Sequence, residues 1–449
     1  MSSIKKTLLS VLLAVLSQAC AVQQYQVNSL AERLDYAAPE TILHSLEANR
    51  PSQRDRAQYL LNTGLLKSIT GDFEGAILDL QSAKRILNSL QAISVSENLA
   101  AATINETLRS YDASPSERVL LHVLLSIDYL MLNDLDAARV EVLQADVVMN
   151  ELAREDRPIG QLASAHFIAG LVYELNREFD NARISYQKAG NLMTLRNMSP
   201  PSALRSSLLS LNRRLGVDAG DNGDLEPSLP LARPPDPNMA EIIVIYWDGV
   251  VTSKRGTSAS VWSPELNQIV SLALPYYPPS DYVARPFTLR IAGEEHRTEM
   301  IEDIETLLRQ DLEDESAAIH AMTLARMVSK YQIVKSAGDH SEGLGLFANI
   351  VAMASESADI RSWNMLPSSI QIERFSLPAG EYPLPYPLDP GSQQAGLAQS
   401  RLPVAAGDKI VLFVPGVSER LFSYTQASPY GRYQGIEAES SMSQKDPSL

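Results

Sequence analysis

Residues 170–189, GLVYELNREFDNARISYQKA, carry a pattern that recurs along the first half of the chain. Gly170 is followed after twelve residues by Ala182, and after seven more by Ala189. The same spacing of small residues occurs twice upstream, and every copy has an acidic, turn-like patch between its first two small residues. The small residues of the three copies are Gly64, Ala76, Ala83, Ser126, Ala138, Ala145, Gly170, Ala182 and Ala189. This pattern predicts three copies of one structural unit.

The small residues indicate close packing of helices. Two antiparallel helices joined by a tight turn approach closely only where the facing side chains are short, so the Gly or Ser should face the first Ala. The pattern resembles the tetratricopeptide repeat (TPR), a helix-turn-helix unit of about 34 residues. The matching windows are 57–90, 119–152 and 163–196. A generic helical bundle is the alternative.

Composition limits the function classes. The 449 residues, 45% of them apolar, can form two or three domains with sizeable cores. The formal charge of -16, without a block of Lys or Arg, argues against nucleic-acid binding. The six histidines include no pair at metal-ligand spacing, and the sequence shows no nucleophile elbow or phosphate loop. We therefore expect no metal, no cofactor and no enzymatic activity.

The N-terminus is typical of an exported protein. Lys5 and Lys6 precede an apolar run from Leu8 to Leu16, which is too short to span a membrane but fits a signal peptide over residues 1–19. Cys20 follows and is the only cysteine of the chain, so it forms no internal disulfide.

The position of Cys20 resembles a bacterial lipobox, which implies that a lipid is attached to Cys20 after the preceding peptide is removed. Ordinary secretion is the alternative, because Ala19-Cys20-Ala21 also satisfies an A-x-A cleavage rule. Ala21, rather than Asp, follows the cysteine, and by resemblance to lipoprotein sorting this implies the outer membrane. A soluble periplasmic protein is the alternative location.

The whole chain is predicted to be multidomain, with an α-helical TPR-like solenoid followed by an α+β domain. Five prolines in a short span indicate a linker between these halves, which we expect to be separable there. The predicted parts are a signal peptide (1–19), a tether and first helix (20–56), a TPR-like helical domain (57–216) with an insert (91–117) and a capping helix (202–215), a linker (217–239), an α+β domain (240–425) and a disordered tail (426–449).

The second half shows mixed periodicity. Apolar and β-branched runs predict strands, and two stretches with helical spacing predict one helix capped by Thr298 and a second one over residues 317–331. The predicted strands are 241–251, 268–274, 286–291, 370–377, 402–404 and 409–414.

Four runs, 137–141, 271–279, 358–367 and 377–380, resemble a family of TPR-containing bacterial lipoproteins without an assigned activity. The likeness covers residues 25–420 and implies a fold and a compartment but little chemistry. Within 358–367, Arg361 and Trp363 form the most site-like stretch of the second half. A buried Trp beside a paired Arg is the structural alternative, and we favour it.

The TPR resemblance implies a concave surface lined by the first helix of each unit. Eleven of the fifteen lining positions are apolar, and the cationic set that clamps a peptide carboxylate in some TPR domains is absent. The apolar positions are Leu61, Leu65, Ile69, Leu120, Val123, Ile127, Leu130, Met131, Phe167, Leu171 and Leu175.

An exposed apolar trough of this size implies a cover. The cover could be the chain itself, through the insert, the first helix or the second domain, or it could be a partner's amphipathic helix or a lipid chain. We interpret the protein as a periplasm-facing lipoprotein and a non-enzymatic adaptor for envelope proteins. The alternatives are a regulator of a cell-wall synthesis enzyme and a carrier of an apolar ligand in the trough.

Lipid anchoring gives a direct test. Replacing Cys20→Ala should abolish incorporation of a radiolabelled fatty acid and release the protein from the membrane fraction, because acyl chains supply ~0.8 kcal/mol of attachment per buried methylene. A wild-type protein that takes up no label would contradict the prediction.

Overall fold

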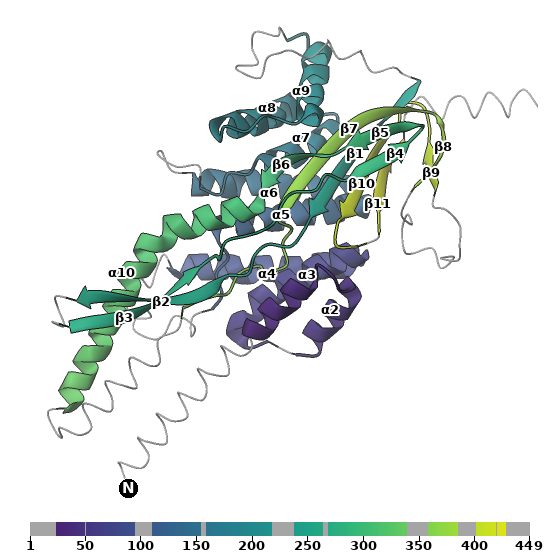
Figure 1. The fold of residues 1–449 in the computed structure, drawn as a ribbon. Helices are drawn as coiled ribbons and strands as arrows, with labels where there is room; N and C mark the ends of the chain where they lie inside the picture. The colour runs from purple at the N-terminus through teal and green to yellow at the C-terminus, as the bar shows by residue number, and fades with distance from the viewer. Residues whose placement is uncertain are drawn as a thin grey trace, which may run out of the picture.

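A computed structural model describes residues 24–49, 51–94, 110–153, 159–217, 238–263, 268–338, 358–384, 401–418 and 420–427. These residues form a helical N-terminal half and a C-terminal half built on a β-sheet (Figure 1). The predicted signal peptide, Cys20, residues 95–109 of the predicted insert, residues 218–237 of the predicted linker and residues 428–449 lie outside the described part.

The helical half contains three hairpins of paired helices, which coincide with the three windows of the sequence pattern. A helical stretch at residues 24–33 and two short helices precede them, and α9 follows. The bounds are α2 Pro39–Glu47, η1 Gln53–Asp55, α3 Arg56–Thr70, α4 Phe73–Ser94, α5 Pro115–Met131, α6 Leu135–Leu152, α7 Ala163–Leu175, α8 Phe179–Leu195 and α9 Ser202–Leu215.

Each hairpin reverses the chain at a residue in the left-handed region. Gly71, Asn133 and Arg177 have φ angles of 88°, 60° and 62°, and they occupy the same position of the three units. This conformation ends a helix, and glycine and asparagine adopt it most readily. All three units thus have the same left-handed turn, although a different residue occupies it in each.

The small residues lie where the paired helices touch. A Cβ atom on Gly64 would lie 2.6 Å from Leu80 Cγ, and one on Gly170 would lie 2.5 Å from the Tyr186 ring. Ser126 is buried and donates to the Val123 carbonyl at 2.7 Å. The remaining small positions are all buried to 2% exposure or less: Ala76, Ala83, Ala138, Ala145, Ala182 and Ala189.

The C-terminal half is organised on a five-stranded mixed sheet of order β11-β10-β1-β7-β6. Its central strand β1 pairs parallel with β10 and antiparallel with β7, and the outer pairs are antiparallel. The strands are β1 Met239–Asp248, β6 Glu299–Asp303, β7 Ser369–Pro378, β10 Lys409–Pro415 and β11 Phe422–Gln426.

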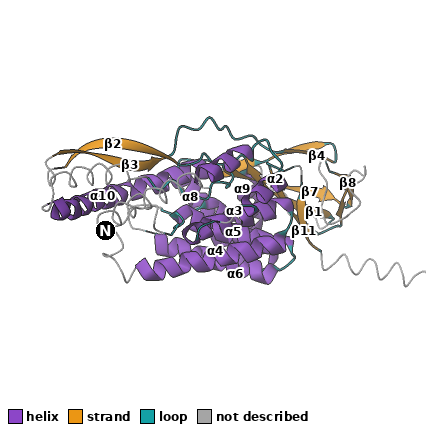
Figure 2. Cartoon of the chain, turned by 90° about the horizontal axis from the view of Figure 1, so that it is seen from below, coloured by secondary structure: helices purple, strands orange, loops and turns teal. Residues whose placement is uncertain are grey.

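Within the described residues of this half, three two-stranded hairpins and one long helix accompany the sheet. Hairpin β2–β3 and helix α10 extend together away from the rest of the described structure (Figures 1 and 2). The bounds are β2 Arg255–Ser263, β3 Gln268–Tyr276, β4 Thr288–Ile291, β5 Glu294–Arg297, β8 Gly380–Pro383, β9 Arg401–Val404 and α10 Ile304–Gly338.

The helix predictions for this half are corrected by the structure. Residues 299–303, expected to begin a helix capped by Thr298, form the edge strand β6 on β7. The two expected helices are one continuous helix of 35 residues. Between Ile304 and Gly338 the sequence contains no Gly or Pro, so nothing in it stops the helix once it has begun.

The sheet closes the inner side of the helical half. Ile243, Ile245 and Phe413 on one face of the sheet belong to the same hydrophobic core as Leu61 and Leu130 of the helices. Phe73 of α4 meets Phe422 of β11 edge-to-face, with ring centroids 5.0 Å apart. Strand β11 also contacts α5, and β6 contacts α7. The two halves therefore share one core.

The opposite face of the sheet has a smaller core. Ile242, Val244 and Leu412 pack there against Leu289 of β4 and Leu402 of β9. Burial on both faces explains why β1 has a nearly continuous apolar run instead of an alternating pattern. Because the halves share a core, we expect them not to separate at the linker, since each would then expose its side of that core.

The shared core predicts opposite outcomes for two matched substitutions. Leu130 is 1% exposed and Leu78 is 70% exposed, and both are leucines of the helical half. Leu130→Glu should lower the free energy of unfolding by about 3 kcal/mol or more, because it places an uncompensated carboxylate in the core. Leu78→Glu should change the free energy of unfolding by no more than about 0.5 kcal/mol. Denaturant melts measure both effects. A Leu130→Glu variant as stable as the wild type would contradict the conclusion that the trough is covered.

Candidate interaction site

The predicted trough is occupied by the chain's own sheet. Ten of its eleven apolar residues are at most 3% exposed, and Met131 is partly buried against the same core. Of the covers considered from the sequence, the second domain is observed, and the first helix and the described end of the insert add Leu34, Ile42 and Tyr111 to the same core. A partner helix or an apolar ligand has no room on these residues, so the structure does not support the ligand-carrier alternative.

The polar positions of the trough are also satisfied. Gln58 donates from Nε2 to the Ser362 carbonyl at 2.7 Å, and the Ser164 backbone N–H donates to Glu302 Oε2 at 2.9 Å. Both bonds join the helical half to the C-terminal half. Ser68 bonds within the helical half instead. Because a buried polar group without a partner is costly, these bonds favour a single register of the sheet in the trough.

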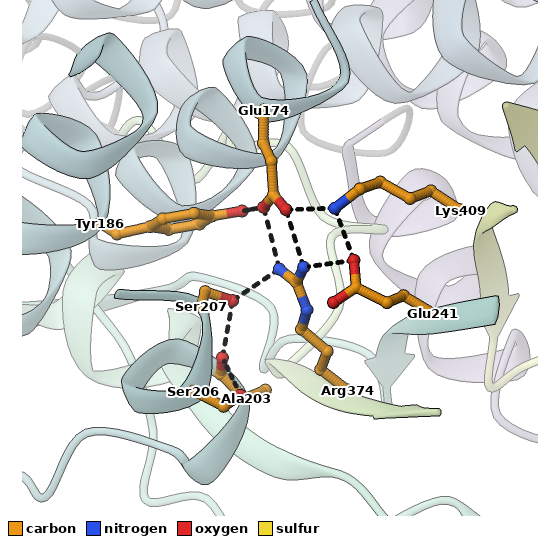
Figure 3. Close-up of polar contacts among 8 residues, drawn as sticks. All are labelled: Glu174, Tyr186, Ala203, Ser206, Ser207, Glu241, Arg374 and Lys409. Atoms are coloured by element: carbon orange, nitrogen blue, oxygen red, sulfur yellow. Dashed lines mark hydrogen bonds and ion pairs between the residues drawn. The ribbon is translucent and has the colours of Figure 1, made fainter. Parts of the chain in front are cut away.

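A buried ion network joins the halves at the fourth polar position of the trough, Glu174 on α7 (Figure 3). Both Glu174 oxygens accept from Arg374 on β7, at 2.7 and 2.9 Å. The Tyr186 hydroxyl of α8 donates to Glu174 at 2.9 Å, and Lys409 Nζ of β10 pairs with it as well. Glu241 of β1 accepts from Arg374 at 2.9 Å and also from Lys409.

The network balances two carboxylates against two cations. Burial by itself would raise the pKa of Glu174, but Arg374 and Lys409 outweigh burial and hold that pKa well below its usual range. Burial likewise opposes the charge of Arg374, yet Glu174 and Glu241 keep its pKa well above normal. We interpret the network as a clamp between the halves.

The site-like stretch 358–367 has the structural role that the sequence analysis favoured. Arg361 bonds to Asp359 on its own segment and to Asp55 at 3.0 Å, beside the start of α3. Trp363 is fully buried, and its backbone N–H donates to Glu117 of α5 at 2.6 Å. These contacts hold the segment against the helical half.

A pocket of about 130 Å³ lies beside this segment. Its walls come from residues 24–30, the ends of α2 and α3, and residues 358–361. Among the described residues that line it, Arg361 is the only cation and is already paired with carboxylates, and none is a histidine. The described part of the lining therefore offers no free cation for an anionic ligand.

The two histidines at equivalent repeat positions are core residues. His122 Nδ1 lies 2.7 Å from Glu141 Oε2, and Lys84 donates to the same carboxylate at 2.7 Å. Burial lowers the pKa of His166 to about 4, so it is neutral near pH 7. Within the described ranges, no group of three or more His, Cys, Asp or Glu side chains could hold a metal ion.

The outer face of the helical half shows what the sequence analysis missed. Leu78 on α4, Val140 on α6 and Ile184 on α8 are 70%, 48% and 48% exposed. Each lies fourteen residues after the first small residue of its unit, so the three are equivalent positions. Such an apolar residue recurring on an exposed helix face is not required by packing.

On α6 the apolar surface continues along the helix. Leu143 and Val147 are 40% and 54% exposed and follow Val140 at spacings of three and seven residues, which places all three on one face. We call the set Leu78, Val140, Leu143, Val147 and Ile184 the outer patch. In Figure 2, α4 and α6 form the lower edge of the structure.

Side chains bridge the three helices of the outer patch. Lys84 of α4 pairs with Glu141 of α6 at 2.7 Å, and Lys188 of α8 pairs with Asp146 of α6 at 2.9 Å. The second helices are thus neighbours on the outer face. The apolar residue at the equivalent position of each hairpin can be read from the sequence. It points to an exposed patch only once the structure shows that the first helices are covered.

Comparisons with known proteins add little to this geometry. No protein-family model matches the chain, and no curated protein matches it. MamA from AMB-1 aligns over 44% of this chain and 85% of its own at 12% identity, with a TM-score of 0.28. BtubC (BKLC) from P. vanneervenii aligns over 46% and 84% at 14% identity, with a TM-score of 0.30. Likenesses this weak carry no argument about function.

The clamp predicts a large effect from a single substitution. Arg374→Met should reduce the free energy of unfolding by about 3 kcal/mol, because removing one partner of a buried pair leaves the other poorly compensated. The control is Arg290→Met, since Arg290 is 80% exposed in its ion pair with Glu295 and should change stability by less than about 1 kcal/mol. Equal denaturation midpoints for the two variants would show that the clamp contributes nothing.

Proposed function

We propose that this protein is a non-enzymatic adaptor of the bacterial cell envelope that binds partner proteins through its outer patch. The observation that carries the proposal is the recurrence of an exposed apolar residue at one position of all three hairpins. Exposed apolar patches on a monomer mark interaction sites. The inner trough, the usual partner site of a TPR-type array, is filled by the sheet, so the outer patch takes this role.

The proposal includes a lipid anchor at Cys20 and a location at the outer membrane facing the periplasm. The support is the signal-peptide pattern followed by the sole cysteine. Among the described residues, no helix is long and apolar enough to cross a membrane. The TPR-type array and the α+β half act in this proposal as one rigid body that presents the patch.

Photo-crosslinking in intact cells tests the adaptor function. A photoreactive amino acid placed at Leu78, Val140 or Ile184 should capture the same envelope protein from all three positions, because the three side chains belong to one surface. Leu143→Asp introduced beside the probe at Val140 should abolish capture without lowering the melting temperature, since exposed substitutions cost little stability.

The matched control is a probe at Val283, which is 76% exposed but lies outside the outer patch. It should not capture that protein. Capture of the same protein from Val283, or capture that persists with Leu143→Asp, would show that the outer patch is not the partner site.

A further inference from the structure

A second row of equivalent residues runs beside the outer patch. Glu74, Asp136 and Asp180 each precede the apolar residue of their hairpin by four positions, so each lies one helical turn away on the same face. All three side chains are exposed. The outer face therefore carries an apolar row and, parallel to it, an acidic row, both repeated three times.

Two other acids of these helices, unlike the acidic row, have cationic partners. Glu141 and Asp146 are paired with lysines of neighbouring helices. Glu74, Asp136 and Asp180 have no ion pair or side-chain hydrogen bond within the part of the chain that the structure describes, although Asp136 contributes to the raised pKa of Arg139. An acid in the first turn of a helix interacts favourably with the helix dipole. That role alone requires no apolar residue one turn further on.

We propose that the outer face binds a basic amphipathic helix of a partner protein, with its apolar side on the apolar row and its Lys or Arg residues facing the acidic row. This inference rests on the proposed adaptor function and adds the chemistry of the partner. The charge is complementary, since the chain carries a formal charge of -16 and the acidic row adds three unpaired carboxylates at the site.

The spacing of the rows sets the length of the partner segment. One lysine–carboxylate pair joins α4 to α6 and another joins α6 to α8, so we take ~10 Å for each gap and about 20 Å for the row. At a rise of 1.5 Å per residue, a helix of about 14 residues covers that span. Its apolar anchors would recur at spacings of three and four residues, as in other helices bound along one face.

Binding of defined peptides to the full chain tests the inference. The probe is a fluorescent amphipathic helix of Lys and Leu, about 14 residues long, and the comparison peptides replace every Lys by Glu or every Leu by Ser. We expect the Lys/Leu peptide to bind, the Glu/Leu and Lys/Ser peptides to bind at least about tenfold more weakly, and added salt to weaken the Lys/Leu complex.

Two sets of variants locate the binding. Neutralising the acidic row with Glu74→Gln, Asp136→Asn and Asp180→Asn should weaken binding of the Lys/Leu peptide by about tenfold and reduce the salt dependence of that binding. The matched control replaces three exposed acids of the other half with Glu294→Gln, Glu313→Gln and Glu381→Gln. Its net charge equals that of the first variant, and it should bind the peptide like the wild type.

Val140→Asp should also weaken the peptide while leaving the thermal melt unchanged. Equal losses in the acidic-row variant and the matched control would show attraction to net charge alone and would overturn the inference. Binding of the Glu/Leu peptide as tight as that of the Lys/Leu peptide, or no binding of the latter, would overturn it too. If crosslinks in cells still map to the outer patch in that case, the adaptor function stands and only the partner chemistry is wrong.

Discussion

The structure depends on one burial: the inner faces of α3, α5 and α7 are covered by the sheet of the C-terminal half. The inner faces are mostly apolar, and neither half could leave its side of this contact in water without exposing residues such as Leu65 and Phe413, which are fully buried. At about 25 cal/mol per Å² of apolar surface removed from water, such an interface outweighs any single polar contact. The array of helical hairpins and the sheet are therefore one folding unit, and the concave side is part of the core.

Burial alone does not select one register, because an apolar sheet could slide in an apolar trough. The polar positions of the trough supply the missing specificity. Glu174 accepts from Arg374 and Lys409 of the sheet, and Ser164 donates to Glu302 on the edge strand. Any other register would leave these groups buried without partners, which costs more than the bonds themselves contribute. A rigid body with a defined register keeps the three outer helices, and with them the outer patch, in a fixed arrangement.

The sequence predicted the hairpins well because their determinants are local. The small-residue spacing, the turn and the apolar period all lie within each window, and the helix bounds agree with it. The edges of the sheet were harder to predict: β11 was missed, and β6 has the composition of a helix start. The site was the least predictable part. Whether Leu130 or Leu78 is exposed depends on where the sheet docks, and that contact joins residues as far as 200 positions apart, such as Glu174 and Arg374.

The central claim is that the halves form one body, and a cleavage experiment tests it most directly. A specific protease site inserted into residues 218–237, outside the described part, would allow the connection to be cut in the purified, folded protein. The account predicts that both fragments then elute together in size-exclusion chromatography at the volume of the intact chain, and separate only in denaturant. Elution as two independently folded fragments would contradict it.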